Sequence, residues 1–296
     1  MTAALALLAA RAGKRVLAID VDAKGDLAAA LGSPPAGFVP RVVQHDLSVL
    51  ELHTEESFQE YLNIYFKVPR LTRLTPLSRV FDFIATGVPG PRDMLVVGKI
   101  AYEERRKEPD SRSPLWDLIL VDSAAGGQAE SHLAAPKAML TLVRGGVIRA
   151  QVEWIEALIR DPVRTTVVLC ALPEEMPVVE AIELNERLRN GSGVTVDMCV
   201  LNRAVDDPVT AAHRRLMSAL IKPEHAEAVT QHLGGSPAPL EAGIDLQAHL
   251  YDTTARYMRQ LRNRLPMPVI PVPFIVDRTG LTTTRAVADA LSSRLA

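Results

Sequence analysis

Short apolar runs recur along the chain, and each is bounded by turn residues or prolines. Continuous rather than alternating apolarity indicates strands that are covered on both faces, as in a parallel sheet flanked by helices. The five runs that predict such strands are residues 16–21, 118–122, 166–171, 194–201 and 269–272. A less regular stretch, residues 39–47, predicts one further strand.

Helical periodicity fills much of the sequence between these runs. The segments that predict helices are residues 136–144, 151–160, 178–189 and 283–295. Strands that alternate with helices are the sequence form of a doubly wound α/β fold with a mostly parallel sheet. We therefore expect that fold class.

Two long stretches break the alternation because they are rich in helical patterns and poor in strands. We predict that residues 50–108 and 208–264 are insertions that form a helical subdomain. The α/β core would then consist of residues 1–49, 109–207 and 265–296.

Composition narrows the class of protein. The 33 basic and 35 acidic side chains nearly cancel, so no bulk charge attracts nucleic acid or anionic lipid. Cys170 and Cys199 lie in apolar runs, which predicts two buried thiols and a reducing compartment. The opening apolar run of about nine residues is too short to span a membrane, so we expect a cytoplasmic protein without stable membrane insertion.

Acidic side chains gather where predicted strands end. Asp20 lies at the carboxyl end of the first apolar run, Asp22 and Asp26 lie just beyond it, and Asp122 closes the run WDLILVD. In open parallel sheets, ligands bind outside these strand ends, and carboxylates there suit a Mg²⁺–phosphate site. The alternative is that the acids cap the following helices. Glycines in the turns DAKGD and DSAAGGQ favour the site, because they let backbone amides approach an anion.

The segment VLAIDVDAKGDLAAALG resembles the first switch region of the deviant Walker A ATPases, the group that contains ParA, MinD and the ArsA or guided-entry ATPases. The pattern of that group is D-P-[AQ]-x-x-L. The resemblance implies that Asp22 is the catalytic aspartate that orients the attacking water. Ala23 stands where the group has proline.

The segment VDSAAGGQ is similar to the second switch of ArsA, D-T-A-P-T-G-H. This likeness implies that Asp122 is the Walker B aspartate on the metal side and that Gly127 senses the γ-phosphate. Gln128 and Ala125 replace the histidine and proline of the family.

Further segments, FDFIATGVPGPRDMLVVGKI and LPEEMPVVEAIEL, look like parts of bacterial ArsA-like ATPases. In VLNRA, the resemblance assigns adenine recognition to Asn202, and in PVIPVPFIVDRTGL it places Pro271 and Pro273 in a loop over the base. As a whole it implies ATP and Mg²⁺ as cofactors, a homodimer or a heterodimer with a paralogue, and a possible protein client. The insertions fit a ParA- or MinD-type positioning ATPase less well.

The sequence departs from this family most strongly at its start. The family has G-K-G-G-V-G-K-[ST]-T just before a helix like TAALALLAARAGKRV, so Met1 follows the point where the loop would end. The loop strand is normally central, and its dozen or so ladder bonds, at roughly 1 kcal/mol each, rival the stability of a domain. One expectation is that the true start lies upstream. The alternative is a non-hydrolysing pseudo-ATPase, a scaffold that pairs with an intact paralogue.

The sequence gives little support for a zinc site or for a serine nucleophile. The seven histidines show no zinc-ligand spacing, and no G-x-S-x-G elbow surrounds Ser123. Both cysteines fall within predicted strands of the core, which makes arsenite transport a poor fit.

Overall fold

The computed structural model describes residues 1–21, 24–53, 56–57, 60, 91–123, 125–205, 209–236, 238–276 and 279–295. The chain forms two compact units. The first contains Met1–Val168, Glu183–Asp197 and Ile275–Ala296, and the second contains Leu169–Ile182 and Met198–Phe274.

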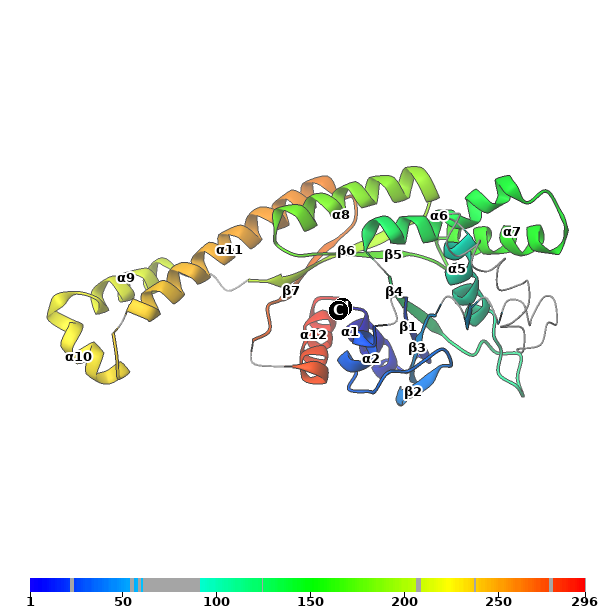
Figure 1. The fold of residues 1–296 in the computed structure, drawn as a ribbon. Coiled ribbons are helices and arrows are strands. Elements are labelled where there is room, and N and C mark those ends of the chain that lie inside the picture. Colours follow the sequence, from blue (N-terminus) through cyan, green and yellow to red (C-terminus); the bar gives the residue numbers. More distant parts are fainter. Residues whose placement is uncertain are drawn as a thin grey trace, which may run out of the picture. The chain divides into compact units, whose positions relative to one another are not determined.

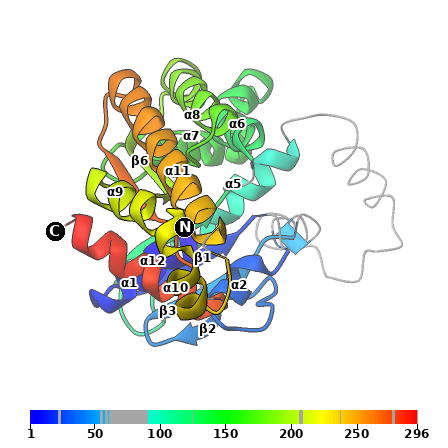
Figure 2. The same cartoon turned by 90° about the vertical axis from the view of Figure 1, so that its left-hand side faces the viewer.

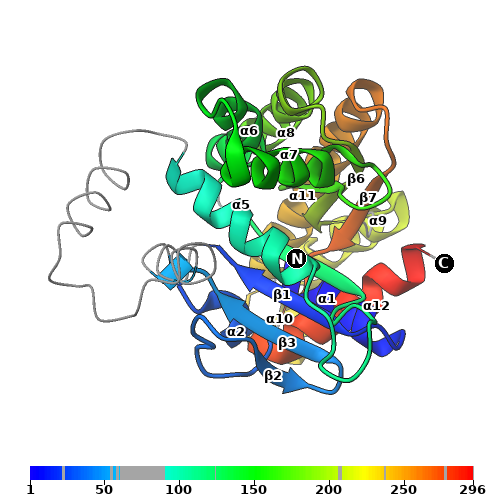
Figure 3. The ribbon, with the colours of Figure 1, turned by 90° about the vertical axis from the view of Figure 1, so that its right-hand side faces the viewer.

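The first unit is built on a four-stranded sheet (Figures 1 and 3). Its strands are β1 (Val16–Asp20), β2 (Arg41–Gln44), β3 (Leu47–Glu51) and β4 (Leu118–Asp122), in the order β2-β3-β1-β4. β1 pairs in parallel with both β3 and β4, and β2 is antiparallel to β3. The two strands predicted at residues 16–21 and 118–122 are therefore confirmed.

The strand predicted at residues 39–47 is confirmed in part, because β2 lies within this range and a second strand, β3, begins at its last residue. Asp46 turns the chain between them with a left-handed φ of 59°. No glycine or proline lies at that turn to signal it in the sequence.

Alternate residues of β1 face opposite sides of this sheet. Val16 and Ala18 share a core with α1 (Thr2–Arg11) and α2 (Asp26–Ala30), and α12 (Gly280–Leu295) packs against both helices. Leu17 and Ile19 share another core with Val96 of α5 (Pro91–Glu104). The sheet is thus covered on both faces, as continuous apolarity predicted.

Further helices of the first unit continue from α5. α6 (Gly126–Leu142) packs against α5 and against α7 (Gly146–Arg160). The one-turn element η2 (Leu188–Ser192) follows α8 (Glu175–Arg187) and contacts α6, where Arg187 pairs with Glu130 at 2.8 Å. These helices agree with the helices predicted from periodicity, although α6 begins ten residues earlier, at Gly126 rather than 136.

An ion pair joins β1 and β4 at their amino ends. The Arg15 guanidinium donates to both carboxylate oxygens of Asp117, at 2.7 and 3.0 Å, and the Arg15 amide donates to the same carboxylate at 2.9 Å. Arg15 also pairs with Glu108. These hydrogen bonds hold the pKa of Asp117 well below its ordinary value.

β4 is the edge of its sheet among the residues that the structure describes, since its one hydrogen-bonded strand neighbour there is β1. None of its five residues is buried, and Leu118 is 37% exposed. All five residues of β1 are buried. An apolar run that was expected inside a sheet therefore lies at an edge.

The second unit holds most of a three-stranded sheet, β5 (Val167–Ala171), β6 (Val196–Ala204) and β7 (Val269–Pro273), in that order. The sequence predicted these strands, but it predicted a single sheet, and the described strands form two. Cys199 on β6 is buried, as expected. Cys170 is exposed, so that prediction was wrong; it lies on β5, an edge strand of this sheet.

Residues 208–264 are rich in helix, as predicted. They contain α9 (Ala211–Leu220), α10 (Pro223–Leu233) and the long α11 (Ala238–Arg264), with α9 beside the first turns of α11 (Figure 2). At the other predicted insertion, β3 extends to Glu51, beyond the boundary drawn at residue 49. Within the described ranges, no helix is long and apolar enough to cross a membrane.

Candidate functional site

Three strands of the first unit end in a carboxylate at the same level. Asp20 on β1 is in register with Glu51 on β3 and with Asp122 on β4. Because the strands are parallel, the three acids form one row along the carboxyl edge of the sheet. Asp20 and Glu51 are each 4% exposed.

Glu51 was missed as a site residue, since it was placed in the predicted helical insertion. The signal was present in the sequence. Glu51 closes the apolar run LSVLE in the way that Asp122 closes LILVD.

Asp122 is the last residue of β4, lies beside the start of α1, and precedes α6 by four residues. The Thr2 hydroxyl donates to Asp122 Oδ1 at 2.6 Å, although 120 residues separate the two in sequence. Three residues after β4, Ala125 caps α6 without a side-chain hydrogen bond, and Gly127 lies exposed in the first turn. Nothing within 4 Å would meet a Cβ added at Gly127. The first-turn amides of α6 and the dipole of this helix favour an anion.

Asp22, the predicted catalytic residue, lies outside the described residues. The structure describes the turn on either side of it. Asp20 ends β1, and Gly25, with a left-handed φ of 77°, caps α2.

The predicted adenine-site residues come together in the second unit. Asn202 lies on β6, where its Oδ1 accepts a hydrogen bond from the Arg203 amide at 3.0 Å. On neighbouring β7, Pro271 is in register with Leu201, and Pro273 with Ala204. A register irregularity between Leu201 and Ala204 contains Asn202 and Arg203, and Arg203 has a left-handed φ of 56°. A side-chain amide and two prolines thus lie close together on adjacent strands.

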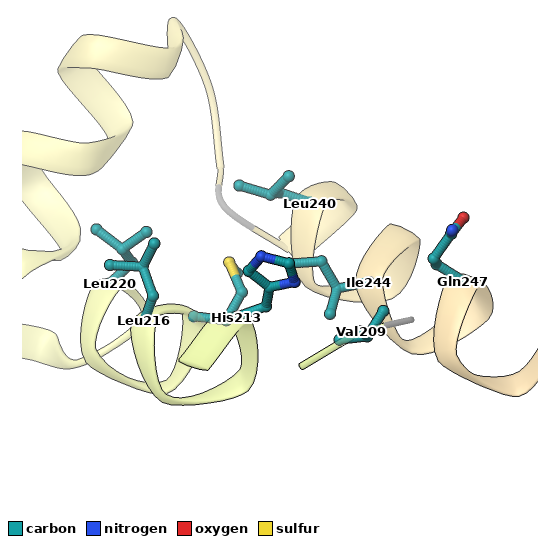
Figure 4. Close-up of a pocket in the computed structure, with 8 residues that line it drawn as sticks. Val209, His213, Leu216, Leu220, Leu240, Ile244 and Gln247 are labelled. Atoms are coloured by element: carbon teal, nitrogen blue, oxygen red, sulfur yellow. The ribbon is translucent and has the colours of Figure 1, made fainter. Parts of the chain in front are cut away.

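The second unit also has an apolar pocket of about 480 Å³ between α9 and α11 (Figure 4). The His213 ring lies at its centre, and His213 also forms a capping box with Thr210 at the start of α9. The other residues that line this pocket are Val209, Leu216, Met217, Leu220, Leu240, Ile244 and Gln247.

No group of three or more His, Cys, Asp or Glu side chains that could enclose a metal ion occurs within the part of the chain that the structure describes. The row of carboxylates is therefore not an all-protein metal cage. Mg²⁺ commonly binds through one or two carboxylates together with water and substrate phosphates, so this finding is compatible with a Mg²⁺–nucleotide site.

Comparison with known proteins places these features in context. No family model matches the chain. The chain is 26% identical to ATPase BagA of Mycobacterium tuberculosis strain H37Rv over 312 aligned residues, which cover 99% of this chain and 88% of BagA. It matches the protein named Putative ATPase Mb3704, from Mycobacterium bovis, to the same extent. This similarity along the full chain supports an ATPase family, a general ATPase function and the use of a nucleotide.

Proposed function

We propose that this chain carries most of the nucleotide site of an ArsA-like ATPase of the deviant Walker A group. A segment upstream of Met1 would supply the phosphate-binding loop and its strand. ATP binding and hydrolysis would drive a conformational cycle of a dimer, which hands a client to a partner. The observation that carries the proposal is the position of Asp122 beside the open edge of β4.

The residues that would contact the phosphates and the metal lie in the first unit. Asp122 and the Thr2 hydroxyl are hard oxygen groups 2.6 Å apart, which suits the water shell of Mg²⁺. Mg²⁺ would supply charge neutralisation at the phosphates. The exposed Gly127 amide at the start of α6 would contact the γ-phosphate, and Asp22 would orient the attacking water.

The open edge of β4 supports an upstream strand. A strand buried in a parallel sheet needs neighbours on both sides, and an uncovered apolar edge is a template for pairing. β4 has the apolar composition of an interior strand but is partly exposed at all five positions. A parallel strand beside β4 would also bring the loop that follows it to the level of Asp122.

Asn202, in the second unit, is the residue to which the resemblance assigns adenine recognition. Asn202 has a carbonyl oxygen and an amide group, which can pair with the donor and acceptor edge of adenine. Pro271 and Pro273 would flank the base with apolar rings.

The proposal is tested by ATP turnover in residues 1–296 preceded by their native upstream coding sequence. Asp122→Asn should lower turnover roughly 10–100-fold, the usual cost of losing a group that orders a metal's surroundings. Asp22→Asn should also lower kcat. Asp117→Asn is the matched control, because Asp117 lies just before the other end of β4 and should affect stability but not turnover.

Unchanged turnover in Asp122→Asn or Asp22→Asn would refute the role assigned to that residue. If an in-frame stop codon precedes Met1 and the chain binds ATP without turnover, the non-hydrolysing scaffold replaces the ATPase proposal.

A further inference from the structure

Glu51 is held by the loop that follows α2. Its Oε1 accepts a hydrogen bond from the Ala36 amide at 2.9 Å, and its Oε2 accepts one from the Gly37 amide at 3.4 Å. The Glu51 amide in turn donates to the Gly37 carbonyl at 2.9 Å. One residue at the end of β3 therefore makes three hydrogen bonds to two consecutive loop residues.

The same carboxylate also lies near Gly25, the residue at which α2 begins. A Cβ added to Gly25 would be 3.8 Å from Glu51 Oε1 and 3.5 Å from Cγ of Pro35, which are ordinary van der Waals distances. Gly25 has a left-handed φ of 77°, so a residue with a side chain would be strained there by its backbone conformation. Glu51 and Pro35 thus lie beside the start of α2.

The described residues on either side of Asp22 both have Glu51 as a neighbour. Asp20 belongs to β1 and pairs in register with Glu51, and Gly25 lies near the Glu51 carboxylate and Pro35. A carboxylate that is only 4% exposed needs hydrogen-bond donors, and the two loop amides satisfy it. Loss of the carboxylate would leave those amides unpaired and would release the loop from the end of β3.

We propose that Glu51 is a positioning residue that holds the loop after α2, and with it the start of α2 at Gly25, against the carboxyl end of the sheet. Asp22 precedes Gly25 by three residues in the sequence, so the expected effect on turnover rests on the proposed function. Glu51 would act on turnover through this loop and the start of α2, without contacting the nucleotide.

Two variants and a matched control test the proposal. Glu51→Gln keeps the size of the side chain but can satisfy one amide instead of two, and Glu51→Ala removes both acceptors. Glu104→Gln is the control, because Glu104 is also a glutamate of the first unit, partly buried and ion-paired, but its partner is Arg164, between α7 and β5.

The first readout is hydrogen exchange of residues 24–37 in the chain of 296 residues. Both Glu51 variants should raise the exchange rate roughly tenfold or more there and leave β4 unchanged. The second readout is ATP turnover of the upstream-extended protein. Here kcat should fall about tenfold or more, with KM within about twofold, because a misplaced group slows chemistry more than binding. Glu104→Gln should change neither readout.

Wild-type exchange of residues 24–37 in a folded Glu51→Gln variant would overturn the proposal, and so would faster exchange with unchanged kcat. If Glu51→Ala does not fold, Glu51→Gln decides the question. If the extended wild-type protein hydrolyses no ATP, the proposed function fails, and the exchange rates still decide whether Glu51 holds the loop after α2.

Discussion

β1 and β4 are neighbours of similar sequence that differ sharply in burial. Both are apolar, have five residues and end in aspartate. Every residue of β1 is buried, and none of β4 is. The difference lies in their neighbours, because β1 has a strand on each side and β4 has one among the described residues. The apolarity of β4 is therefore a property of an interior strand, which an edge position does not explain.

The three-stranded sheet also has an inner strand, β6, beside an edge strand, β5. The largest expected effect is the difference in alkylation rate between the two cysteines on these strands. Burial raises the pKa of the Cys199 thiol on β6 to about 12, with a smaller contribution from Cys170, which is exposed on the edge strand β5. A rise of about three pH units lowers the thiolate fraction roughly a thousandfold. Iodoacetamide at pH 8 should alkylate Cys170 and spare Cys199, as followed by peptide mass spectrometry. Equal alkylation rates would contradict the difference in burial between the two thiols on β5 and β6.

Truncating a leucine in each strand measures the difference in burial between β1 and β4 as a loss in the free energy of unfolding. Leu17→Ala in β1 removes a fully buried side chain and should cost about 2–5 kcal/mol in urea denaturation. Leu118→Ala in β4 should cost about 1 kcal/mol or less, because that side chain is 37% exposed. In the upstream-extended protein, the cost at Leu118 should rise. Equal costs in residues 1–296 would contradict the assignment of β4 as an open edge.

The smallest expected effect concerns the ion pair that ties the amino ends of β1 and β4. Hydrogen bonds from Arg15 depress the pKa of Asp117 in the folded state. The stability from this pair is therefore present above the unfolded pKa, near about 4, and is lost as the pH falls through the lower folded pKa. Asp117→Asn should lower the urea midpoint by a similar amount from about pH 5 to 8. This difference should shrink below about pH 4, and a difference that grows on acidification would contradict the assignment.

Much of the fold follows from apolar periodicity, because continuous runs such as 118–122 are long enough to mark strands and helices such as α7 are amphipathic. The turn at Asp46 was missed because a left-handed aspartate leaves little trace in a sequence. The separation of the strands into two sheets could not be read from the runs either, since apolarity does not reveal which strands are neighbours.

The candidate site was predictable to a similar degree. Acids at the ends of parallel strands meet at one edge, which correctly brought Asp20 and Asp122 together. The hydrogen bond from Thr2 to Asp122 spans 120 residues and depends on how α1 packs, so no local pattern could indicate it. Glu51 was overlooked because the long helix-rich stretch that follows it hid a strand end.

Hydrogen exchange at Leu118–Asp122 tests the upstream strand most directly, when residues 1–296 are compared with the same chain preceded by its native upstream coding sequence. β4 should exchange faster than β1 in the shorter chain and should be protected to the same degree as β1 in the longer one. Equal exchange of β4 in the two proteins would show that no upstream strand pairs with its edge, and would contradict the proposed function.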